Sequence, residues 1–260
     1  MLAVTRRNLI KAQIQEKKSV TVPALAKKFE VTEETIRRDL KILEGEGVLS
    51  RTYGGAFIQD GVQNEVDFTV RMDAYVDSKT IIAESCRRLV RHGDSIYLDN
   101  STTALFVAES LMQFRITVVT NSLAIINRLC SQSNIHLIAV GGSFDSDTNS
   151  FMGAGTLTAL SAYHVDKAFL SCRSLSMEHG VTDSYEELAG LRRVILNRAN
   201  ESYLIADHSK FNYASFVKIS GFEPISGIVT DKALSPEWRS FLAEKGIACY
   251  DGPALPPGDC

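Results

Sequence analysis

The sequence predicts an α/β protein in which a small N-terminal unit of three helices and a β-hairpin precedes a larger domain built on a largely parallel sheet. From residue 79 onward, short apolar runs alternate with amphipathic stretches. This alternation is typical of strands buried on both faces and of the helices that cover them. Before residue 57, apolar residues recur at helical spacing and are followed by a glycine-containing hairpin. The 260 residues have room for one small and one medium domain.

The charge of the chain is distributed unevenly between these two parts. Residues 1–56 carry eleven Lys/Arg and seven Asp/Glu, a net charge of +4, whereas the rest carries 17 and 24, a net charge of −7. A basic segment attached to an acidic one indicates that only the N-terminal part meets a polyanion. No apolar run approaches the roughly 18–20 residues that cross a bilayer, and the N-terminus lacks the apolar stretch of a secretion signal. We therefore expect a cytoplasmic protein without membrane contact.

The cysteines and histidines show no spacing that favours a metal site. The five cysteines are widely separated and lack C-x-x-C spacing, so we expect neither a disulfide framework nor structural zinc. Cys86, Cys130, Cys172 and Cys249 are interpreted as small buried apolar residues. The histidines form no metal-ligand cluster in the sequence. We expect no metal and no cofactor.

Two helices are predicted before residue 30. The first presents an apolar stripe formed by Leu9, Ile10, Ala12 and Ile14. The second spans 23–29, is capped by Thr21 and has Pro23 in its first turn, where a missing N–H costs nothing. Its inward-facing residues are Leu25, Ala26 and Phe29.

A third helix is predicted to begin after Thr32, whose hydroxyl caps it, and to end at the glycines 45 and 47. Ile36, Leu40 and Leu43 fall at i, i+4 and i+7, so one face packs inward. The other face is polar and basic, as a helix that reads the major groove requires. Residues 48–56 form a small β-wing. The candidate DNA-contacting residues are Thr32, Thr35, Arg37, Arg38, Lys41, Arg51 and Tyr53.

The residues alone leave two interpretations of this unit, a DNA-binding head and a three-helix packing module without DNA contact. Asp39 would repel a phosphate and is expected to orient a neighbouring arginine. The segment 23–44, above all Thr-Ile-Arg-Arg-Asp-Leu at 35–40, resembles the helix-turn-helix of the DeoR family of bacterial repressors, and the Gly-Gly-Ala at 54–56 resembles its wing. Tyr53 stands where the family usually has histidine, and its hydroxyl can still donate to a phosphate. The resemblance implies operator binding.

Residues 1–57 are thus the predicted DNA-binding unit, 58–78 a linker, 79–250 the second domain and 251–260 a flexible tail. The strands expected in the second domain are 95–98, 116–120, 135–140, 167–170, 203–206 and 227–230. The helices expected between and after them are 103–113, 122–132, 154–162, 184–199 and 235–245.

Polar loops follow several of these strands. In open parallel sheets, ligands gather at the carboxyl ends of the strands, where loops lead into helix N-termini. The loop after the first strand offers hydroxyls and free N–H groups for a phosphate, although an ordinary cap by Ser101 or Thr102 explains it equally simply. The loop at 207–210 brings a carboxylate and an ammonium to the same rim. The candidates from these loops are Asp99, Asn100, Ser101, Thr102, Thr103, Asn121, Ser122, Gly141, Gly142, Asp207 and Lys210.

These loops also resemble the sensor domain of DeoR-type repressors, which is similar in fold to sugar-phosphate isomerases such as ribose 5-phosphate isomerase. The resemblance rests on 99–103, 119–122, 141–142 and 206–211. It implies a phosphate at 99–103 and sugar hydroxyls near Asp207, with Lys210 close by. Asn100-Ser101 replaces a smaller pair, and Arg173 stands where glycine-rich sequence is common, so both are expected to reshape the site. Glu187 is a further, weaker candidate.

The predicted function is a transcriptional repressor of a carbohydrate-utilisation operon, released from operator DNA by a phosphorylated sugar. A homodimer or homotetramer is expected because symmetric operators require symmetric proteins. No catalytic residues are predicted. The alternatives are a sugar-phosphate isomerase with a DNA-binding appendage, with Asp207 or Glu187 as base, and an activator or a responder to an unphosphorylated sugar.

Overall fold

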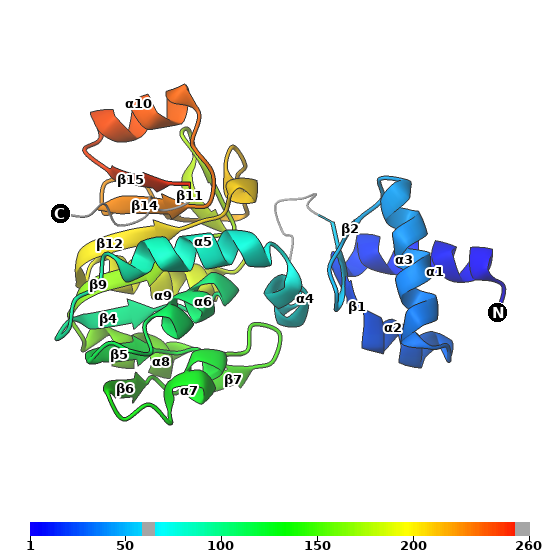
Figure 1. Cartoon of the computed structure of the whole chain (residues 1–260), viewed down its shortest axis with the longest axis horizontal. Helices are drawn as coiled ribbons and strands as arrows, with labels where there is room; N and C mark the ends of the chain where they lie inside the picture. The colour runs from blue at the N-terminus through cyan, green and yellow to red at the C-terminus, as the bar shows by residue number, and fades with distance from the viewer. Residues whose placement is uncertain (59–65, 253–260) are drawn as a thin grey trace. The chain divides into compact units, whose positions relative to one another are not determined.

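The computed structural model describes residues 1–58 and 66–252, and the chain divides into two compact units between Val76 and Asp77. In Figure 1 the N-terminal unit is drawn in blue up to β3 (Gly55–Phe57) and in cyan at α4 (Phe68–Asp73), and the larger unit runs from cyan to red. The expected linker, 58–78, includes helix α4 (Phe68–Asp73) and the first residues of α5 (Val76–Arg87). Of the expected tail, Asp251 ends a strand, and 253–260 lie outside the described residues.

The N-terminal unit contains the three predicted helices, a three-stranded sheet and α4. The helices are α1 (Ala3–Lys17), α2 (Val22–Phe29) and α3 (Glu33–Gly45). The strands are β1 (Ser19–Thr21), β2 (Ser50–Arg51) and β3 (Gly55–Phe57), in the antiparallel order β1-β3-β2. The hairpin of this sheet was predicted, whereas its third strand, β1, was not. A Cβ at Gly55 would lie 2.2 Å from the Val20 carbonyl oxygen, so glycine is needed where β3 meets β1.

The core of this unit differs from the prediction mainly on α1. Ile10 and Ile14 are fully buried, but Leu9 is 45% exposed and Ala12 is exposed as well. Arg6 takes the place expected for another apolar residue, because it lies one turn before Ile10 on the same face and pairs with a buried carboxylate. The inward residues of α2 and α3 are buried as predicted, except that Ala26 is only partly covered.

A seven-stranded sheet organises the larger unit, and every neighbouring pair in it is parallel. Its order is β15-β14-β12-β9-β4-β5-β6. From β4 the chain moves outward through β5 to β6, then returns to β9 and moves the other way. The direction of winding therefore reverses between β4 and β9. The bounds are β4 (Ser95–Leu98), β5 (Ile116–Thr120), β6 (Ile135–Ala139), β9 (Val165–Leu170), β12 (Ala199–Ile205), β14 (Gly227–Thr230) and β15 (Ala248–Asp251).

The predicted helices of this unit are present, each one to three residues shorter at one or both ends. Right-handed crossovers that run in opposite directions put their helices on opposite faces of a sheet, so α6 and α7 cover one face and α9 the other. Helix α5 crosses in front of the strands in Figure 1. The bounds are α6 (Thr102–Ser110), α7 (Leu123–Leu129), α8 (Ala154–Ser161), α9 (Glu186–Leu196) and α10 (Pro236–Glu244).

Several strands were not predicted. Strand β12 begins four residues before the expected 203, because its exposed amino end at Asn200 and Glu201 carries no apolar run. The short strands mix polar and apolar residues and show no clear period. They are the hairpin β7 (Ser143–Asp145) and β8 (Ser150–Met152), and the antiparallel sheet of β10 (Ser174–Ser176), β11 (Gly180–Asp183) and β13 (Val217–Ser220).

Candidate functional site

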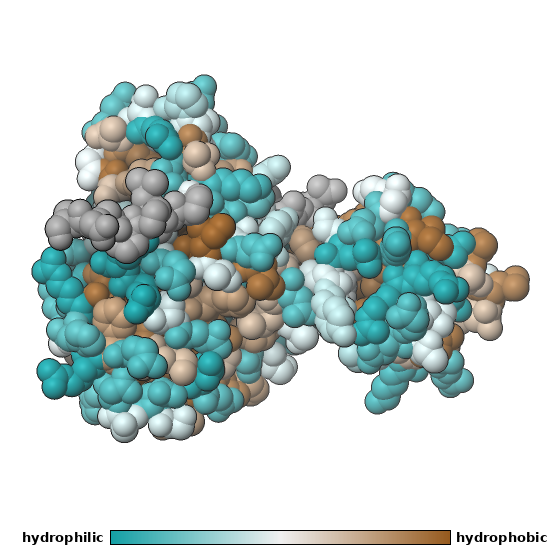
Figure 2. Space-filling view, in the orientation of Figure 1, coloured by the Kyte–Doolittle hydropathy of each residue, from teal (hydrophilic) through white to brown (hydrophobic). Residues whose placement is uncertain are grey.

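Helix α3 presents a polar face opposite its buried one. Thr32 caps it as predicted, accepting from the Thr35 N–H at 3.3 Å, and the two threonine hydroxyls lie 2.9 Å apart. Arg38 and Lys41 are exposed. Neither forms a hydrogen bond or an ion pair with the residues that the structure describes. Figure 2 shows hydrophilic side chains over this helix. Two cations are therefore available on the exposed face of α3.

Asp39 lies on the buried face of α3 and is only 2% exposed. It accepts from Arg6 Nε at 2.5 Å and from Arg7 Nη1 at 3.5 Å, both on α1. Asp39 does orient an arginine, but the partners come from α1 and not from α3. The pair ties α1 to α3, and Arg38 remains outside it.

The wing is joined to α3 by two contacts. The Arg37 guanidinium carbon lies 5.0 Å from the centroid of the Tyr53 ring, and Arg37 Nη2 donates to Glu33 at 2.7 Å. Arg51 donates from Nε to Glu44 at 2.7 Å and from its backbone N–H at 3.1 Å. The hydrogen bond from the Arg51 side chain holds the pKa of Glu44 below its usual value. All seven predicted DNA-contacting residues therefore lie on α3 or the wing.

At the carboxyl edge of the large sheet, the strand order arranges the predicted loops in a row. Along the edge they follow the order 207–210, 171–173, 99–103, 120–122 and 141–142, which is the order of β12, β9, β4, β5 and β6. The loops after β4 and β9 flank the point where the winding reverses, which is where open α/β sheets bind ligands. The sequence predicted that these loops lie at one edge of the sheet. The order of the strands determines which of the loops are neighbours.

Asp99, after β4, is almost entirely enclosed, with 1% of its surface exposed. Its Oδ1 accepts from the Ser101 N–H at 2.9 Å. Its Oδ2 accepts from the Ser171 N–H at 2.8 Å and from Arg192 Nε at 3.0 Å. Since both oxygens are occupied by the protein itself, Asp99 shapes the loop.

Arg192 on α9 is a residue that sequence reasoning left unassigned. It bridges Asp99 and Asp183 and is 5% exposed. Burial disfavours its charge, but the two carboxylates outweigh burial and raise the pKa of Arg192. The sequence contains a pattern that indicates this role. Arg192 follows Leu188 by four residues on the apolar face of α9, and an arginine is tolerated on such a face only when it is paired.

The start of α6 leaves two backbone donors without an acceptor. The Ser101 hydroxyl caps the helix at the Ala104 N–H, 3.0 Å away, and the Ser101 N–H is held by Asp99. In the described part of the chain, the N–H groups of Thr102 and Thr103 meet no acceptor. Both residues are 5% exposed. The predicted cap by Ser101 is therefore present, but it pairs only the Ala104 N–H and not the N–H groups of Thr102 and Thr103.

The loops after β4 and β5 are tied together by buried side chains. The Tyr97 hydroxyl donates to Asn121 Oδ1 at 3.0 Å, and Asn121 Nδ2 donates to the Phe151 carbonyl at 2.9 Å. Asn100 Nδ2 donates to the Ser150 hydroxyl at 3.2 Å. Burial, and then the charge of Asp99, raises the pKa of Tyr97, so this hydroxyl stays a donor. Ser122 caps α7 at the Ile125 N–H. The hairpin β7–β8 thus takes part in this network, which the sequence did not indicate.

The two glycines after β6 have different surroundings. A Cβ at Gly142 would lie 2.0 Å from Thr156 Oγ1 and 2.6 Å from the Met152 carbonyl, whereas a Cβ at Gly141 would meet nothing within 4 Å. The close approach at Gly142 is to the protein itself. Packing against the protein therefore already explains the glycine at 142, and the role of both glycines in ligand binding stays a prediction.

Asp207, after β12, is 4% exposed and accepts from the Ser209 N–H at 2.9 Å and its hydroxyl at 2.5 Å. Lys210 and Asp207 both act electrostatically on Cys172, whose pKa is raised to about 12, chiefly by burial. Because β12 pairs with β9 in parallel, the loop that carries this carboxylate and ammonium follows a strand next to β9. The ring of His208, the residue after Asp207, lies with its Nδ1 2.7 Å from Asp231 and is partly exposed.

The remaining candidates are less central. The backbone N–H of Arg173 donates to Thr182 at 3.0 Å, and its side chain is half-buried. Glu187 is exposed on the first turn of α9, so the structure does not bring it to the network around Asp99. Cys130 is exposed and Cys249 half-buried, which corrects their expected burial.

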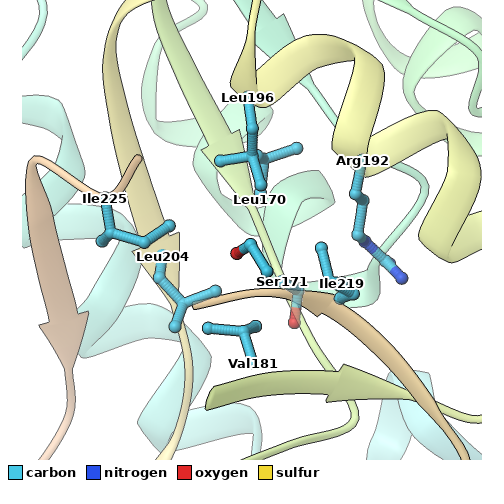
Figure 3. Close-up of a pocket in the computed structure, with 9 residues that line it drawn as sticks. Leu170, Ser171, Val181, Arg192, Leu196, Leu204, Ile219 and Ile225 are labelled. Carbon is cyan, nitrogen blue, oxygen red and sulfur yellow. The ribbon is translucent and has the colours of Figure 1, made fainter. Parts of the chain in front are cut away.

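A small pocket lies beside this network but is a different feature. It is lined by Leu170, Leu204, Ile219 and other apolar side chains, and Figure 3 shows Arg192 at one side of it. None of the predicted effector residues lines it. Within 1–58 and 66–252, no group of three or more His, Cys, Asp or Glu could hold a metal ion. Over the same residues, no helix has the length and apolar character needed to cross a membrane.

Two family models match the chain, the DeoR-like helix-turn-helix domain over residues 6–61 and the DeoR C terminal sensor domain over residues 75–232. The chain belongs to the DeoR family. It is 36% identical to the uncharacterized HTH-type transcriptional regulator YulB of Bacillus subtilis (strain 168), over 95% of this chain and 96% of that relative. It is 29% identical to the HTH-type transcriptional repressor GlcR of the same strain, over 90% of each. The L-fucose operon activator of Haemophilus influenzae is also 29% identical, over 93% of this chain and 97% of its own.

As a DeoR-family member, the protein is a DNA-binding transcriptional regulator with a sensor domain, and not an isomerase. Solved structures give weaker likenesses. Ribose 5-phosphate isomerase A from Methanocaldococcus jannaschii aligns with a TM-score of 0.38 and 19% identity, over 51% of this chain and 53% of that one. The eIF2B delta structure from Chaetomium thermophilum aligns with a TM-score of 0.45 and 12% identity, over 60% and 56%.

Proposed function

We propose that this DeoR-family regulator is a repressor of a carbohydrate-utilisation operon, and that a phosphorylated sugar releases it from its operator. The observation that carries the effector half of this proposal is the start of α6. There, two buried N–H groups, those of Thr102 and Thr103, meet no acceptor in the described chain. A helix N-terminus with free N–H groups is a site for a phosphate, because the helix dipole adds partial positive charge there.

The other polar groups along the same edge suit the rest of a sugar phosphate. Lys210 supplies positive charge, and Asp207 supplies acceptor oxygens for hydroxyl groups. The buried side-chain amides of Asn100 and Asn121, together with Ser122, line the opposite side of the proposed phosphate site. In this proposal Arg173 adds a contact at the end of β9, Gly141 leaves space for the ligand, and Glu187 stays outside the site. Asp99 acts by holding the 99–103 loop in shape.

The DNA half of the proposal rests on the exposed face of α3 and on the wing. Arg38 and Lys41 lie exposed on α3 without a partner among residues 1–58 and 66–252, and Thr35 lies on the same helix. Arg51 is ion-paired with Glu44, so it contributes to DNA contact only if that exposed pair opens. Tyr53, which is 79% exposed, completes the surface. Since the target is DNA, the proposed place of action is the cytoplasm.

Release requires that the sugar phosphate bind one arrangement of the protein better than the other. A coupling of about 1–3 kcal/mol between the two sites suffices for a 5- to 150-fold change in DNA affinity. We propose a homodimer or homotetramer, because two heads at a fixed spacing bind a symmetric operator and a change of spacing releases it. Activation of transcription is the second candidate function, because one relative is an activator and another is a repressor.

A thermal-shift screen of the full chain tests the effector. Sugar phosphates are compared with the corresponding free sugars, because a ligand that binds only the folded state stabilises it by RT ln(1 + [L]/Kd). We expect at least one phosphate to raise the melting temperature and its free sugar to have no effect. The same compound should lower the affinity for DNA. A response to free sugars alone would contradict the phosphate site, and a rise in DNA affinity would indicate an activator.

A further inference from the structure

The side chain of Arg37 is held between α3 and the wing. On one side its guanidinium carbon lies 5.0 Å from the centroid of the Tyr53 ring. On the other, Nη2 donates to Glu33 Oε2 at 2.7 Å, one turn earlier on the helix. The side chain of Arg37 is 30% exposed, whereas Tyr53 is 79% exposed. Arg38, the next residue, is exposed and has no such partners within the described chain.

This arrangement limits what Arg37 can contact. Recognition of guanine by arginine uses two N–H groups of the guanidinium fork at once. In Arg37, one N–H of Nη2 is given to Glu33, and Nε is buried without a hydrogen-bond partner in the described residues. The pair formed by Nε and Nη2 is therefore closed to a base edge, and the N–H groups that remain, those of Nη1 and the second one of Nη2, suit phosphate oxygens. In the described chain, no N–H group of the Arg38 guanidinium has a partner.

We propose that Tyr53 is a positioning residue for DNA binding. Its ring holds Arg37 so that α3 and the wing present one rigid cation to the DNA backbone, and base reading falls to Arg38. This inference rests on the proposed function, in which α3 and the wing bind DNA. It assigns Tyr53 a role through its ring, whereas the sequence alone favoured a contact through its hydroxyl.

The size of the effect follows from the geometry. A cation over an exposed aromatic ring contributes enough to change affinity about 2- to 5-fold. The ring also removes part of the side-chain freedom that Arg37 would lose on binding. Because a phosphate contact carries no sequence information, the loss should be the same for every DNA sequence.

The experiment uses the full chain and two DNA probes, a duplex selected by the protein from a random-sequence pool and an unselected duplex of equal length. Fluorescence anisotropy gives the affinity for each probe. We expect Tyr53→Ala to weaken both probes by the same factor, about 2- to 5-fold for each bound head. Tyr53→Phe should recover the lost affinity, because it keeps the ring. Tyr53→Leu, similar in bulk and not aromatic, should behave like Tyr53→Ala.

A double-mutant cycle shows whether Tyr53 acts through Arg37. In an Arg37→Ala background, Tyr53→Ala should cause no further loss, since the group that it positions is gone. In an Arg38→Ala background, Tyr53→Ala should weaken DNA binding by the same factor as in the wild type. Arg38→Ala alone should change the DNA sequence that the protein selects. Because Tyr53 is exposed, thermal unfolding of these variants should match that of the wild type.

Two results would overturn the inference. If Tyr53→Phe binds as weakly as Tyr53→Ala, the hydroxyl and not the ring carries the contact. If the losses from Tyr53→Ala and Arg37→Ala add, the two residues act independently. Failure of the proposed function is distinct from both, because the wild-type chain would then select no sequence from the pool.

Discussion

Arg192 Nε lies 3.0 Å from Asp99 Oδ2, so a guanidinium on α9 is hydrogen-bonded to the loop that follows β4. The same guanidinium also donates to Asp183 on β11. One buried cation on α9 therefore joins β11, which directly precedes this helix, to the loop after β4, which lies 93 residues earlier. The 99–103 loop is held in place by this ion network in addition to the hydrogen bond from the Ser101 N–H to Asp99 within the loop.

Replacing Arg192 should destabilise the sensor unit strongly. In Arg192→Met, two buried carboxylates lose their cation, which costs about 3–5 kcal/mol. Urea unfolding followed by circular dichroism measures the change. Arg193→Ala is the matched control on the same helix. Its side chain is 39% exposed and pairs with the exposed Glu186, so a loss of about 1 kcal/mol or less is expected. Equal losses in the two variants would contradict this account of the network.

Asp39→Asn should loosen the DNA-binding unit and leave the sensor unit intact. The substitution removes the charge that the buried Arg6 needs, so α1 loses its tie to α3. We expect a loss of about 3 kcal/mol in the N-terminal unit, visible as an earlier unfolding transition by calorimetry. Glu46→Gln, which breaks the exposed pair with Lys11, should leave both transitions nearly unchanged. A sensor transition that moves with Asp39→Asn would count against independent units.

Lys41→Ala should weaken DNA binding alike for all sequences. A lysine that meets a phosphate releases counterions, so its loss should lower the slope of log K against log salt by about 0.9. Anisotropy titrations between 50 and 200 mM salt, roughly the range in which such slopes are measured, provide the test. Lys218→Ala, on an exposed position of β13 in the sensor unit, is the control and should keep the slope. An unchanged slope in Lys41→Ala would remove Lys41 from the DNA interface.

The ionised side chain of Asp231 should stabilise the sensor unit, and this stabilisation should be lost in acid. Burial opposes its ionisation, but hydrogen bonds from Ser78 and His208 outweigh burial and hold the pKa of Asp231 below its usual value. A carboxyl with a lowered folded pKa contributes stability above its unfolded pKa, about 3.9, and loses it as the pH falls through the folded value. The free energy of unfolding of the wild type minus that of Asp231→Asn should therefore shrink below about pH 4.

Unfolding curves at several pH values between about 3 and 6 measure this difference. Asp147→Asn, at an exposed position of the β7–β8 hairpin, serves as the control. A difference that stays constant over this range would show that Asp231 contributes no acid-sensitive stability.

Thiol labelling should separate the cysteines by burial. Cys172 has a pKa raised to about 12 by burial, and burial likewise raises the pKa of Cys86, so neither forms the reactive thiolate near pH 8. Of the four cysteines that the structure describes, Cys130 is the exposed one and should react first with iodoacetamide. Peptide mass spectrometry of the native and the urea-unfolded chain reads this out. Fast labelling of Cys172 in the native chain would contradict the closed loop at the end of β9.

The sequence by itself determined the two-part fold, the three helices of the head and the run of strands in the sensor. These features follow from local rules. Thr21 and Thr32 cap helices because their hydroxyls reach a backbone N–H three residues away, and apolar residues at i, i+4 and i+7 define the buried face of α3. The placement of the polar loops at one edge also follows, because all strands of a parallel sheet end on the same side.

Only the tertiary structure decided which polar groups are already used and which are left over. Asp99 is occupied by Ser171 and Arg192, 72 and 93 residues later in the chain, and Asp39 by Arg6, 33 residues earlier. Gly142 packs closely against Thr156 and the Met152 carbonyl. Such pairings depend on the order of the strands and on the angle at which helices pack, and no local pattern records either. For this reason the sequence could name the loop at 99–103, and only the fold could show that Asp99 holds it while Thr102 and Thr103 keep free donors.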